Sequence, residues 1–199
     1  MLGKVAWITG GARGIGQACA VELARAGCDI AFCDLGGPDE TTRLIESLGR
    51  RALFFEGDVS NRARMEEIGQ AIMDAYGRLD ILVNNAGAAW GAPFEDFPEA
   101  GWDKVMDLNV KGPFFLTQAL YPLLKAAATK AHPAKVINIG SIDGIRLNPW
   151  ETYSYHASKS AILYLTKRMA ARLVQDQINV TAIAPGAFAS DMNKAARDH

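Results

Sequence analysis

The chain has 199 residues, of which 49% are hydrophobic and 22% are charged, and its net charge at pH 7 is −1. This length and balance are typical of one globular domain, so we expect residues 1–199 to form a single domain. Without excess positive charge, the chain lacks the footprint of a protein that binds nucleic acid or an anionic membrane. A strand pattern begins at the N-terminus and no apolar run is long enough to span a bilayer, which favours a cytoplasmic protein.

Six apolar runs predict β-strands: residues 4–10, 28–34, 51–58, 79–87, 134–141 and 178–186. They are apolar almost throughout, as strands buried on both faces of a parallel sheet are. Segments with helical spacing of apolar residues lie between them, for example residues 14–27 and 61–77, and Gly77 suits the end of the second helix. Alternating strands and helices predict a doubly wound parallel α/β sheet, a Rossmann fold with three layers, α/β/α.

Most of the predicted strands end in small or polar residues. The carboxyl ends of parallel strands meet at one edge of the sheet, and ligands of open α/β sheets bind outside that edge. We therefore expect these residues to converge there: Thr9, Gly10, Asp34, Asp58, Asn84, Asn85, Gly140, Ser141, Pro185 and Gly186.

A glycine-rich loop, TGGARGIG at residues 9–16, joins the first predicted strand to the first helix. Gly10, Gly14 and Gly16 do not match the general G-x-G-x-x-G fingerprint, because three residues separate the first two glycines. The glycines still allow a tight turn and a close approach to a pyrophosphate, which the helix N-terminus can bind. On its own, the loop is equally compatible with a plain tight turn.

Asp34 strengthens the interpretation as a dinucleotide site. It ends the second predicted strand, at the distance expected for an acid that binds the adenosine ribose hydroxyls. A carboxylate there repels a 2′-phosphate, and Leu35 follows where a basic residue would have attracted it. Arg13 acts in the opposite direction, because an arginine in the glycine loop can pair with that phosphate. We therefore expect NAD as the cofactor, with NADP as the alternative.

The sequence YHASK places Tyr155 and Lys159 four residues apart, on one face of a predicted helix. The phenol of tyrosine titrates near pH ~10, which is too high for a good base at neutral pH. A neighbouring ammonium favours the phenolate, so we expect Lys159 to lower the pKa of Tyr155 and to prepare it for alcohol–ketone chemistry. Alone, the same spacing also fits an ordinary amphipathic helix.

Ser141 follows the predicted strand that ends in VINI, at the ligand edge of the sheet. Its hydroxyl suits a hydrogen bond to a substrate oxygen beside Tyr155. A nucleophilic serine is a poor interpretation, because no histidine of the chain is placed to activate it. Ser141 and Tyr155 therefore indicate a proton-transfer site rather than a hydrolase.

Taken in order, these motifs resemble the short-chain dehydrogenase/reductase family, and the resemblance runs from residue 4 to about 192. The motifs are TGGARGIG (9–16), DV (58–59), NNAG (84–87), Asn109, Ser141, YHASK (155–159) and PG (185–186). The resemblance implies a catalytic tetrad of Asn109, Ser141, Tyr155 and Lys159, although one residue more than expected separates Ser141 from Tyr155. We expect the intervening loop to bulge.

The resemblance also implies the cofactor contacts. The pyrophosphate would lie against the glycine loop, the ribose against Asp34 and the adenine between Asp58 and Val59, while Lys159 would also bind the nicotinamide ribose. The full set of cofactor-binding candidates is Gly10, Arg13, Gly14, Ile15, Gly16, Asp34, Asp58, Val59, Asn85, Ala86, Gly87, Tyr155, Lys159, Pro185 and Gly186.

Pro113 stands four residues after Asn109 and has no N–H to bond the carbonyl of residue 109 in a helix. One interpretation is that Gly112-Pro113 opens the helix and frees this carbonyl for a water in a proton relay that the family uses. The other is that a helix simply begins near Pro113.

The chain is shorter than the family's usual ~250 residues, within the ordinary range of domain sizes, so we expect the last strand to be missing. PGAFASDM (185–192) resembles the corresponding segment of 3-oxoacyl-acyl-carrier-protein reductases, with sugar and polyol dehydrogenases as close rivals. The expected function is NAD(P)-dependent interconversion of a secondary alcohol and a ketone. The alternative is a truncated cofactor-binding scaffold or regulator without turnover. The resemblance further implies a homo-oligomer, a dimer or a tetramer, and a small-molecule substrate.

Overall fold

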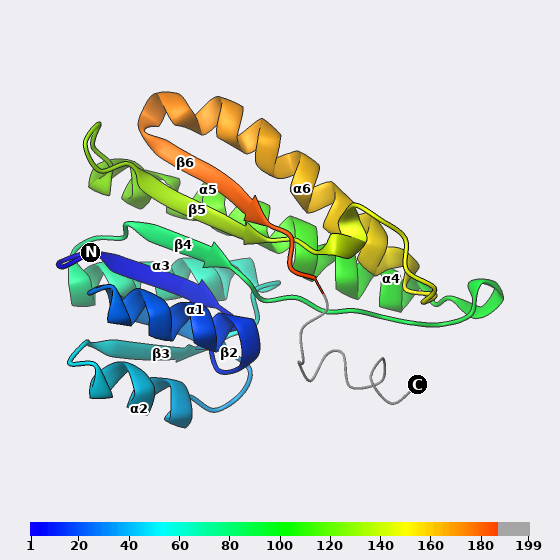
Figure 1. Ribbon diagram of the computed structural model, residues 1–199, viewed down its shortest axis with the longest axis horizontal. Helices are drawn as coiled ribbons and strands as arrows, with labels where there is room; N and C mark the ends of the chain where they lie inside the picture. The colour runs from blue at the N-terminus through cyan, green and yellow to red at the C-terminus, as the bar shows by residue number, and fades with distance from the viewer. Residues whose placement is uncertain (187–199) are drawn as a thin grey trace.

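Six parallel strands form one sheet in this computed structural model, which describes residues 1–186. The strand order is β3-β2-β1-β4-β5-β6 (Figure 1). The strands are β1 (Val5–Thr9), β2 (Asp29–Asp34), β3 (Ala52–Glu56), β4 (Ile81–Asn84), β5 (Ala134–Ile139) and β6 (Ile178–Ile183). Each lies inside a predicted apolar run, and the prediction of a doubly wound parallel sheet is confirmed.

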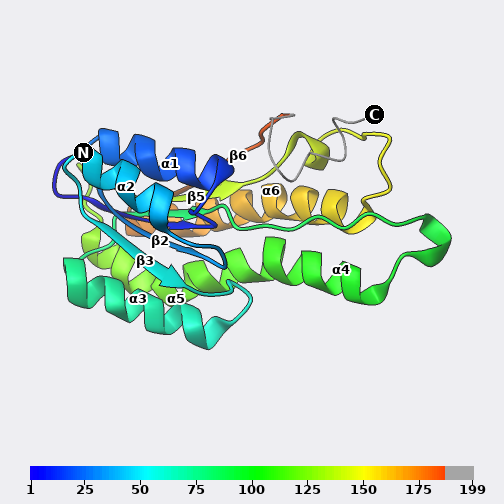
Figure 2. The ribbon, with the colours of Figure 1, turned by 90° about the horizontal axis from the view of Figure 1, so that it is seen from below.

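The helices complete the three expected layers. They are α1 (Gly14–Arg25), α2 (Asp39–Ser47), α3 (Arg62–Tyr76), α4 (Glu99–Met106), α5 (Gly112–Ala127) and α6 (Tyr153–Leu173), with the single turns η1 (Phe94–Asp96), η2 (Asp107–Lys111), η3 (Ile142–Gly144) and η4 (Val174–Asp176). In Figure 2, α1 and α2 lie on one side of the sheet and α3, α4 and α5 on the other. Gly77 ends α3 in the left-handed conformation, with φ 72°, as predicted.

Neighbouring residues of the central strands alternate between two cores. Trp7 and Leu82 pack in the core with α3, α5 and α6, whereas Ile8 and Val83 pack in the core with α1 and α2. Trp7 and Ile8 are both completely buried, so β1 contributes apolar side chains to both faces. This two-sided burial is why the strand sequences are continuous apolar runs rather than alternating ones.

The course of the chain changes direction at β1. This strand pairs with β2 on one side and with β4 on the other. Strands β2 and β3 therefore extend the sheet to one side of β1, and β4, β5 and β6 extend it to the other. Such a switch point opens a crevice at the carboxyl ends of the strands, where α/β proteins bind ligands. The glycine loop after β1 and the Asn84–Gly87 segment after β4 flank that crevice.

None of the helices within residues 1–186 is sufficiently long and apolar to cross a membrane. The cysteines are free thiols: Cys28 and Cys33 are buried and Cys19 is partly buried. Burial raises the pKa of the Cys33 thiol to about 11, which keeps it protonated and unreactive.

Candidate active site

Tyr155 and Lys159 lie in the first turns of α6, where the predicted helix is confirmed. The Lys159 side chain is buried, with 6% of the residue exposed, and its Nζ donates a hydrogen bond of 2.8 Å to the carbonyl of Ile139. The same Nζ lies 5.5 Å from the centre of the Tyr155 ring. The ammonium is therefore held inside the protein between the end of β5 and the phenol.

The sequence predicts that Lys159 lowers the pKa of Tyr155, whereas in the structure this pKa is raised. Burial raises the pKa of Tyr155, the hydrogen bond with Ser141 lowers it, and the charge of Asp143 raises it, so that the net shift is upward. The physical reason is that the phenolate loses hydration, while the nearest partner of the lysine is the Ile139 carbonyl rather than the phenol oxygen. Burial also lowers the pKa of Lys159, to about 8.

Ser141 lies two residues after the end of β5 and is buried beside Tyr155. Its Oγ accepts a hydrogen bond of 3.1 Å from the backbone N–H of Asp143, which leaves the hydroxyl proton for another acceptor. Beyond η3, Ile145 and Leu147 are 67% and 89% exposed. The expected bulge between Ser141 and Tyr155 stays a prediction.

Asn109 is buried in the turn η2, and its side chain is fully engaged by the protein. Its Oδ1 accepts from the N–H of Ala88, and its Nδ2 donates to the Ala88 carbonyl and to the Ser158 Oγ, each at 2.9 Å. Ser158 Oγ in turn donates to the carbonyl of Tyr155 at 2.8 Å. Asn109 therefore ties the loop after β4 to α6. Sequence reasoning missed Ser158, although it lies inside YHASK, one turn after Ser154 and next to Lys159.

At Pro113 the structure has a feature of each interpretation: a distorted helical turn precedes the proline, and α5 begins next to it. The helical path is continuous from α4 to α5 and passes through a π-helical turn at Asp107–Lys111, and Pro113 lies in the first turn of α5. Pro113 cannot donate to the carbonyl of residue 109, and π-turns within α-helices are frequent at functional sites. The proton relay through this carbonyl stays a prediction.

The glycine loop is joined to the end of β4 by backbone contacts. Asn85 Nδ2 donates to the carbonyls of Thr9 and Gly10, at 3.0 and 2.9 Å. The buried Thr9 Oγ1 accepts from the N–H groups of Asn85 and Ala86, at 3.0 and 3.1 Å. A Cβ at Gly16 would lie 2.0 Å from the Gly10 carbonyl oxygen, so only glycine allows α1 to begin this close to β1. Sequence reasoning named Thr9 only as a strand end.

Asp34 is oriented toward the glycine loop by its backbone contacts. Its Oδ2 accepts from the N–H of Ala12 at 3.0 Å, and its Oδ1 accepts from the N–H groups of Leu35 and Gly36 at 2.8 and 3.1 Å. The carboxylate is only partly buried and is fixed at the end of β2. This is the place that the sequence assigned to the ribose-binding acid.

The remaining candidates lie around the same edge of the sheet. Asp58 is exposed and its Oδ1 accepts from the N–H and the hydroxyl of Ser60, both at 2.8 Å, while Val59 is buried against Gly112. The carbonyl of Pro185 accepts from the N–H of Ile142 at 2.9 Å, which connects the end of β6 to the turn after Ser141. Residues 187–199, including most of PGAFASDM, lie outside the described residues.

The glycine loop fits the pyrophosphate of a dinucleotide. Arg13, the N-cap residue of α1, is exposed and makes no side-chain hydrogen bond to the first turn within residues 1–186, and that turn carries no acidic residue. Gly14 has φ 57°, and a Cβ built on it would meet no atom within 4 Å among the described residues. The space beside Gly14 thus leaves room for an anion near the helix N-terminus, where the first N–H groups of a helix lack intrahelical partners.

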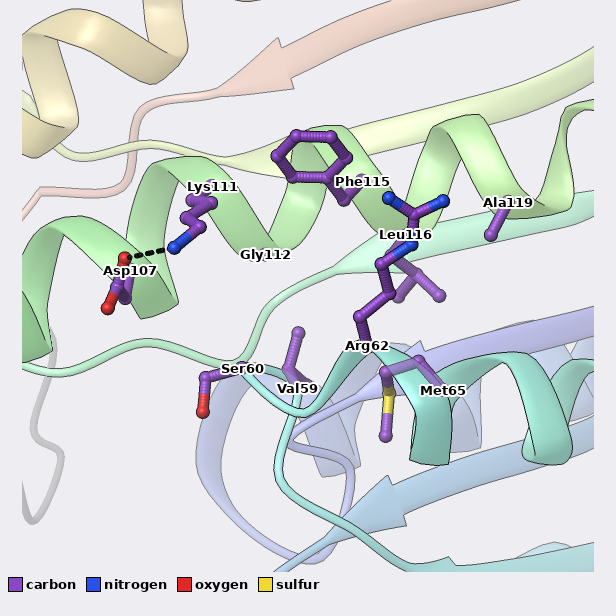
Figure 3. A pocket seen from close by; sticks show the side chains of 10 residues that line it. All are labelled: Val59, Ser60, Arg62, Met65, Asp107, Lys111, Gly112, Phe115, Leu116 and Ala119. Atoms are coloured by element: carbon purple, nitrogen blue, oxygen red, sulfur yellow. Dashed lines mark hydrogen bonds and ion pairs between the residues drawn. The ribbon is translucent and has the colours of Figure 1, made fainter.

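A cavity of about 230 Å³ lies outside the catalytic cluster, between the start of α3 and the helical segment η2–α5 (Figure 3). Val59 and Met65 line one side and Gly112, Phe115 and Leu116 the other, with the Asp107–Lys111 ion pair of 3.1 Å at its rim. None of the four tetrad candidates lines this cavity. A second, mostly apolar groove shares Asp107, Lys111 and Phe115 with this cavity and is also lined by Met106, Val110, Phe114 and Leu165.

Comparison with known proteins identifies the family. Residues 4–199 match the family model of the short chain dehydrogenases. The chain is 43% identical to the rhamnolipids biosynthesis 3-oxoacyl-acyl-carrier-protein reductase of Pseudomonas aeruginosa and 39% identical to the 2-dehydro-3-deoxy-D-gluconate 5-dehydrogenase of Dickeya dadantii; each match covers 98% of this chain and 76% of the relative. The chain is therefore shorter than these relatives, as expected.

Solved structures agree. The fold superposes on the NADP complex of Pseudomonas aeruginosa RhlG with a TM-score of 0.94 and 40% identity, over 100% of this chain and 78% of that one. A 3-oxoacyl-acyl-carrier-protein reductase of Brucella melitensis in complex with NAD gives a TM-score of 0.91 and 31% identity, over 98% and 78%. These relatives are named as reductases and dehydrogenases, which does not favour the alternative of a scaffold without turnover. The chain belongs to the short-chain dehydrogenase family, NAD(P)-dependent oxidoreductases that act on CH–OH groups.

Proposed function

We propose that the protein interconverts a 3-oxoacyl thioester and the corresponding 3-hydroxyacyl thioester, with Tyr155 as the proton donor and acceptor. The observation that carries the proposal is the cluster at the end of β5, where Ser141, Tyr155 and the buried Lys159 meet. The substrate class is supported by the names of the 3-oxoacyl-acyl-carrier-protein reductases among the relatives. A sugar-acid dehydrogenase is the second candidate, because two such relatives are 39% and 38% identical.

In this proposal the nicotinamide, when bound, delivers the hydride to the ketone carbon or removes it from the alcohol. Tyr155 Oη gives its proton to the ketone oxygen during reduction and takes it back during oxidation. A raised pKa keeps the phenol protonated at neutral pH, which suits the direction of reduction. Ser141 Oγ holds the same substrate oxygen with its remaining proton.

Lys159 binds the nicotinamide ribose in this proposal. An ammonium has three N–H donors, and the Ile139 carbonyl takes one of them, so two remain for ribose hydroxyls. Asn109 touches no reactant through its side chain, and it supports the site through Ala88, Ser158 and the backbone of its π-turn.

The cofactor in this proposal is NAD, with NADP as the alternative. The glycine loop, with Gly10, Gly14, Ile15 and Gly16, holds the pyrophosphate, and Asp34 holds the adenosine ribose. The remaining contacts come from Asp58, Val59, Asn85, Ala86, Gly87, Pro185 and Gly186. The fixed Asp34 carboxylate supports NAD because it would face a 2′-phosphate with like charge. Arg13 is exposed at the loop and remains the residue that could accommodate NADP.

Turnover assays test the substrate and the cofactor together. We expect oxidation of NADH by the protein with acetoacetyl coenzyme A as a short 3-oxoacyl thioester, and a larger kcat/KM with NADH than with NADPH. A panel of sugar acids and polyols, assayed with NAD in the direction of oxidation, serves as the comparison. Turnover confined to a sugar acid would contradict the 3-oxoacyl thioester as the substrate. A preference for NADPH would contradict NAD as the cofactor and indicate that Arg13 binds the 2′-phosphate.

We also propose a homo-oligomer, a dimer or a tetramer, that pairs through the face of η2, α5 and α6. The apolar groove on this face supports the proposal, because Phe115 is only partly buried within residues 1–186 and lies beside Phe114 with ring centres 5.2 Å apart. Phe115→Glu is expected to yield monomers in sedimentation velocity, whereas Leu147→Glu, in the outer loop, keeps the wild-type assembly. A monomeric wild-type protein would contradict this. The single domain over residues 1–199 and the cytoplasmic location remain predictions.

A further inference from the structure

The turn that follows Ser141 presses closely on the helix that carries Tyr155 and Lys159. A Cβ at Gly144 would lie 2.6 Å from both the carbonyl carbon and the carbonyl oxygen of Lys159, and 2.9 Å from the N of Ser160. These are backbone atoms of a long helix and cannot rotate away as the end of a side chain can. Gly144 has an ordinary negative φ, so glycine is required here by the close approach alone.

A hydrogen bond from a side chain of α6 also connects the helix to Gly144. Ser160 Oγ donates to the carbonyl of Gly144 at 2.9 Å. Ser160 is exposed and lies one residue after Lys159 on α6. Glycine thus allows the turn to approach, and the serine hydroxyl fixes it in place.

Hydrogen bonds within the turn connect Gly144 to Ser141. The N–H of Gly144 donates to the Ser141 carbonyl at 3.0 Å, and the N–H of Asp143 donates to Ser141 Oγ at 3.1 Å. On the other side, the N–H of Ile142 is held by the Pro185 carbonyl at 2.9 Å. Ser141 therefore caps the three-residue turn η3, which contacts α6 through Gly144 and Ser160.

We propose that Gly144 and Ser160 are positioning residues, whose contact seats the turn η3 on α6 and thereby sets the distance between the Ser141 and Tyr155 hydroxyls. This inference rests on the proposed role of Tyr155 as the proton donor. Neither residue touches the substrate or the cofactor in this proposal. They act through Ser141 alone.

Burial of the phenol and the charged groups that face Tyr155 together set the pKa on which the expected pH effect depends. Asp143, on η3, raises the pKa of Tyr155, and Lys159, on α6, has its ammonium 5.5 Å from the ring. Moving the turn outward weakens both the Ser141 hydrogen bond, which lowers the Tyr155 pKa, and the opposing effect of Asp143. It also relieves the burial of the phenol, which is the largest cause of the raised pKa, so the pH at which Tyr155 loses its proton is expected to change.

The test is the pH profile of alcohol oxidation, in which Tyr155 must be deprotonated and activity rises through its pKa. Gly144→Ala is expected to lower kcat about 10- to 100-fold, as a misplaced catalytic group does, and to shift the pH at which activity rises. The affinity for NADH, measured by its fluorescence, is expected to stay unchanged. Gly37→Ala is the matched control, because its added Cβ meets no atom within 4 Å among the described residues and its φ is ordinary.

A second pair of variants keeps the proposal testable should Gly144→Ala fail to fold. Ser160→Ala removes one hydrogen bond without a steric load and is expected to lower kcat about 2- to 10-fold with the same direction of pH shift. Ser160→Thr, which keeps the hydroxyl, is expected to restore both. Unchanged kcat in folded Gly144→Ala or in Ser160→Ala, or a lower kcat with an unmoved pH profile, overturns the proposal. Full activity of Tyr155→Phe would instead overturn the proposed function on which it rests.

Discussion

Replacing Tyr155 with phenylalanine is expected to lower kcat by about 10²- to 10⁴-fold, the usual contribution of a positioned general acid or base. The phenyl ring keeps its place on α6, but the proton that the ketone oxygen must receive is gone. Binding of NADH is expected to remain at the wild-type level, because Lys159 and the glycine loop are unchanged. Stopped-flow absorbance of the nicotinamide, with fluorescence titration for binding, measures the two effects separately.

Tyr153→Phe is the control for this variant. Tyr153 lies two residues earlier, and its hydroxyl donates to Glu151 Oε1 at 2.7 Å rather than to the catalytic cluster. Its ring packs edge-on against Phe94 and Phe97, with ring centres 5.6 and 5.5 Å apart, and the substitution preserves this packing. Wild-type kcat in Tyr153→Phe, together with loss in Tyr155→Phe, is the expected pattern. Equal losses in both would refute the assignment to Tyr155.

The second large effect is expected at Gly16. In Gly16→Ala the added Cβ would lie 2.0 Å from the Gly10 carbonyl oxygen and 2.5 Å from Asn85 Nδ2. Because the first of these is backbone, the glycine loop and the start of α1 must separate, and the Asn85 hydrogen bonds to Thr9 and Gly10 are strained. We expect a loss of about 1–3 kcal/mol in the free energy of unfolding, the usual cost of overpacking.

The same separation moves the N–H groups that face the pyrophosphate, so NADH affinity is expected to fall by at least about tenfold, since every 1.4 kcal/mol of lost binding free energy is tenfold. Chemical denaturation and fluorescence titration measure the two quantities. Glu22→Ala, on the exposed surface of α1, is expected to leave both near wild type. A Gly16→Ala protein that binds NADH normally would show that the loop does not hold the cofactor.

The sheet could be predicted from the sequence because both of its faces are covered. Strands such as β1, VAWIT, are short continuous apolar runs, and their shortness favours a buried strand over a buried helix. The convergence of Asp34, Ser141 and the glycine loop at one edge followed from the parallel direction of the strands. The order of the strands gave no separate signal in the sequence.

What could not be predicted depends on contacts between distant segments. The π-turn around Asn109 depends on the hydrogen bonds of its side chain with Ala88, 21 residues earlier, and with Ser158, 49 residues later. The direction of the pKa shift of Tyr155 depends on how deeply the phenol is buried and on which group accepts the hydrogen bond of the Lys159 ammonium. Spacing places two side chains on one helical face, but it does not say which acceptor the ammonium binds.

The central position of β1 has a consequence for synthesis. β1 pairs on one edge with β2, at residues 29–34, and on the other with β4, at residues 81–84, which is made much later in synthesis. Until then the nascent chain presents an unpaired apolar strand edge, the kind of surface to which other chains add. Chaperone binding or a slower ribosome during this interval is therefore expected to change the yield of folded protein.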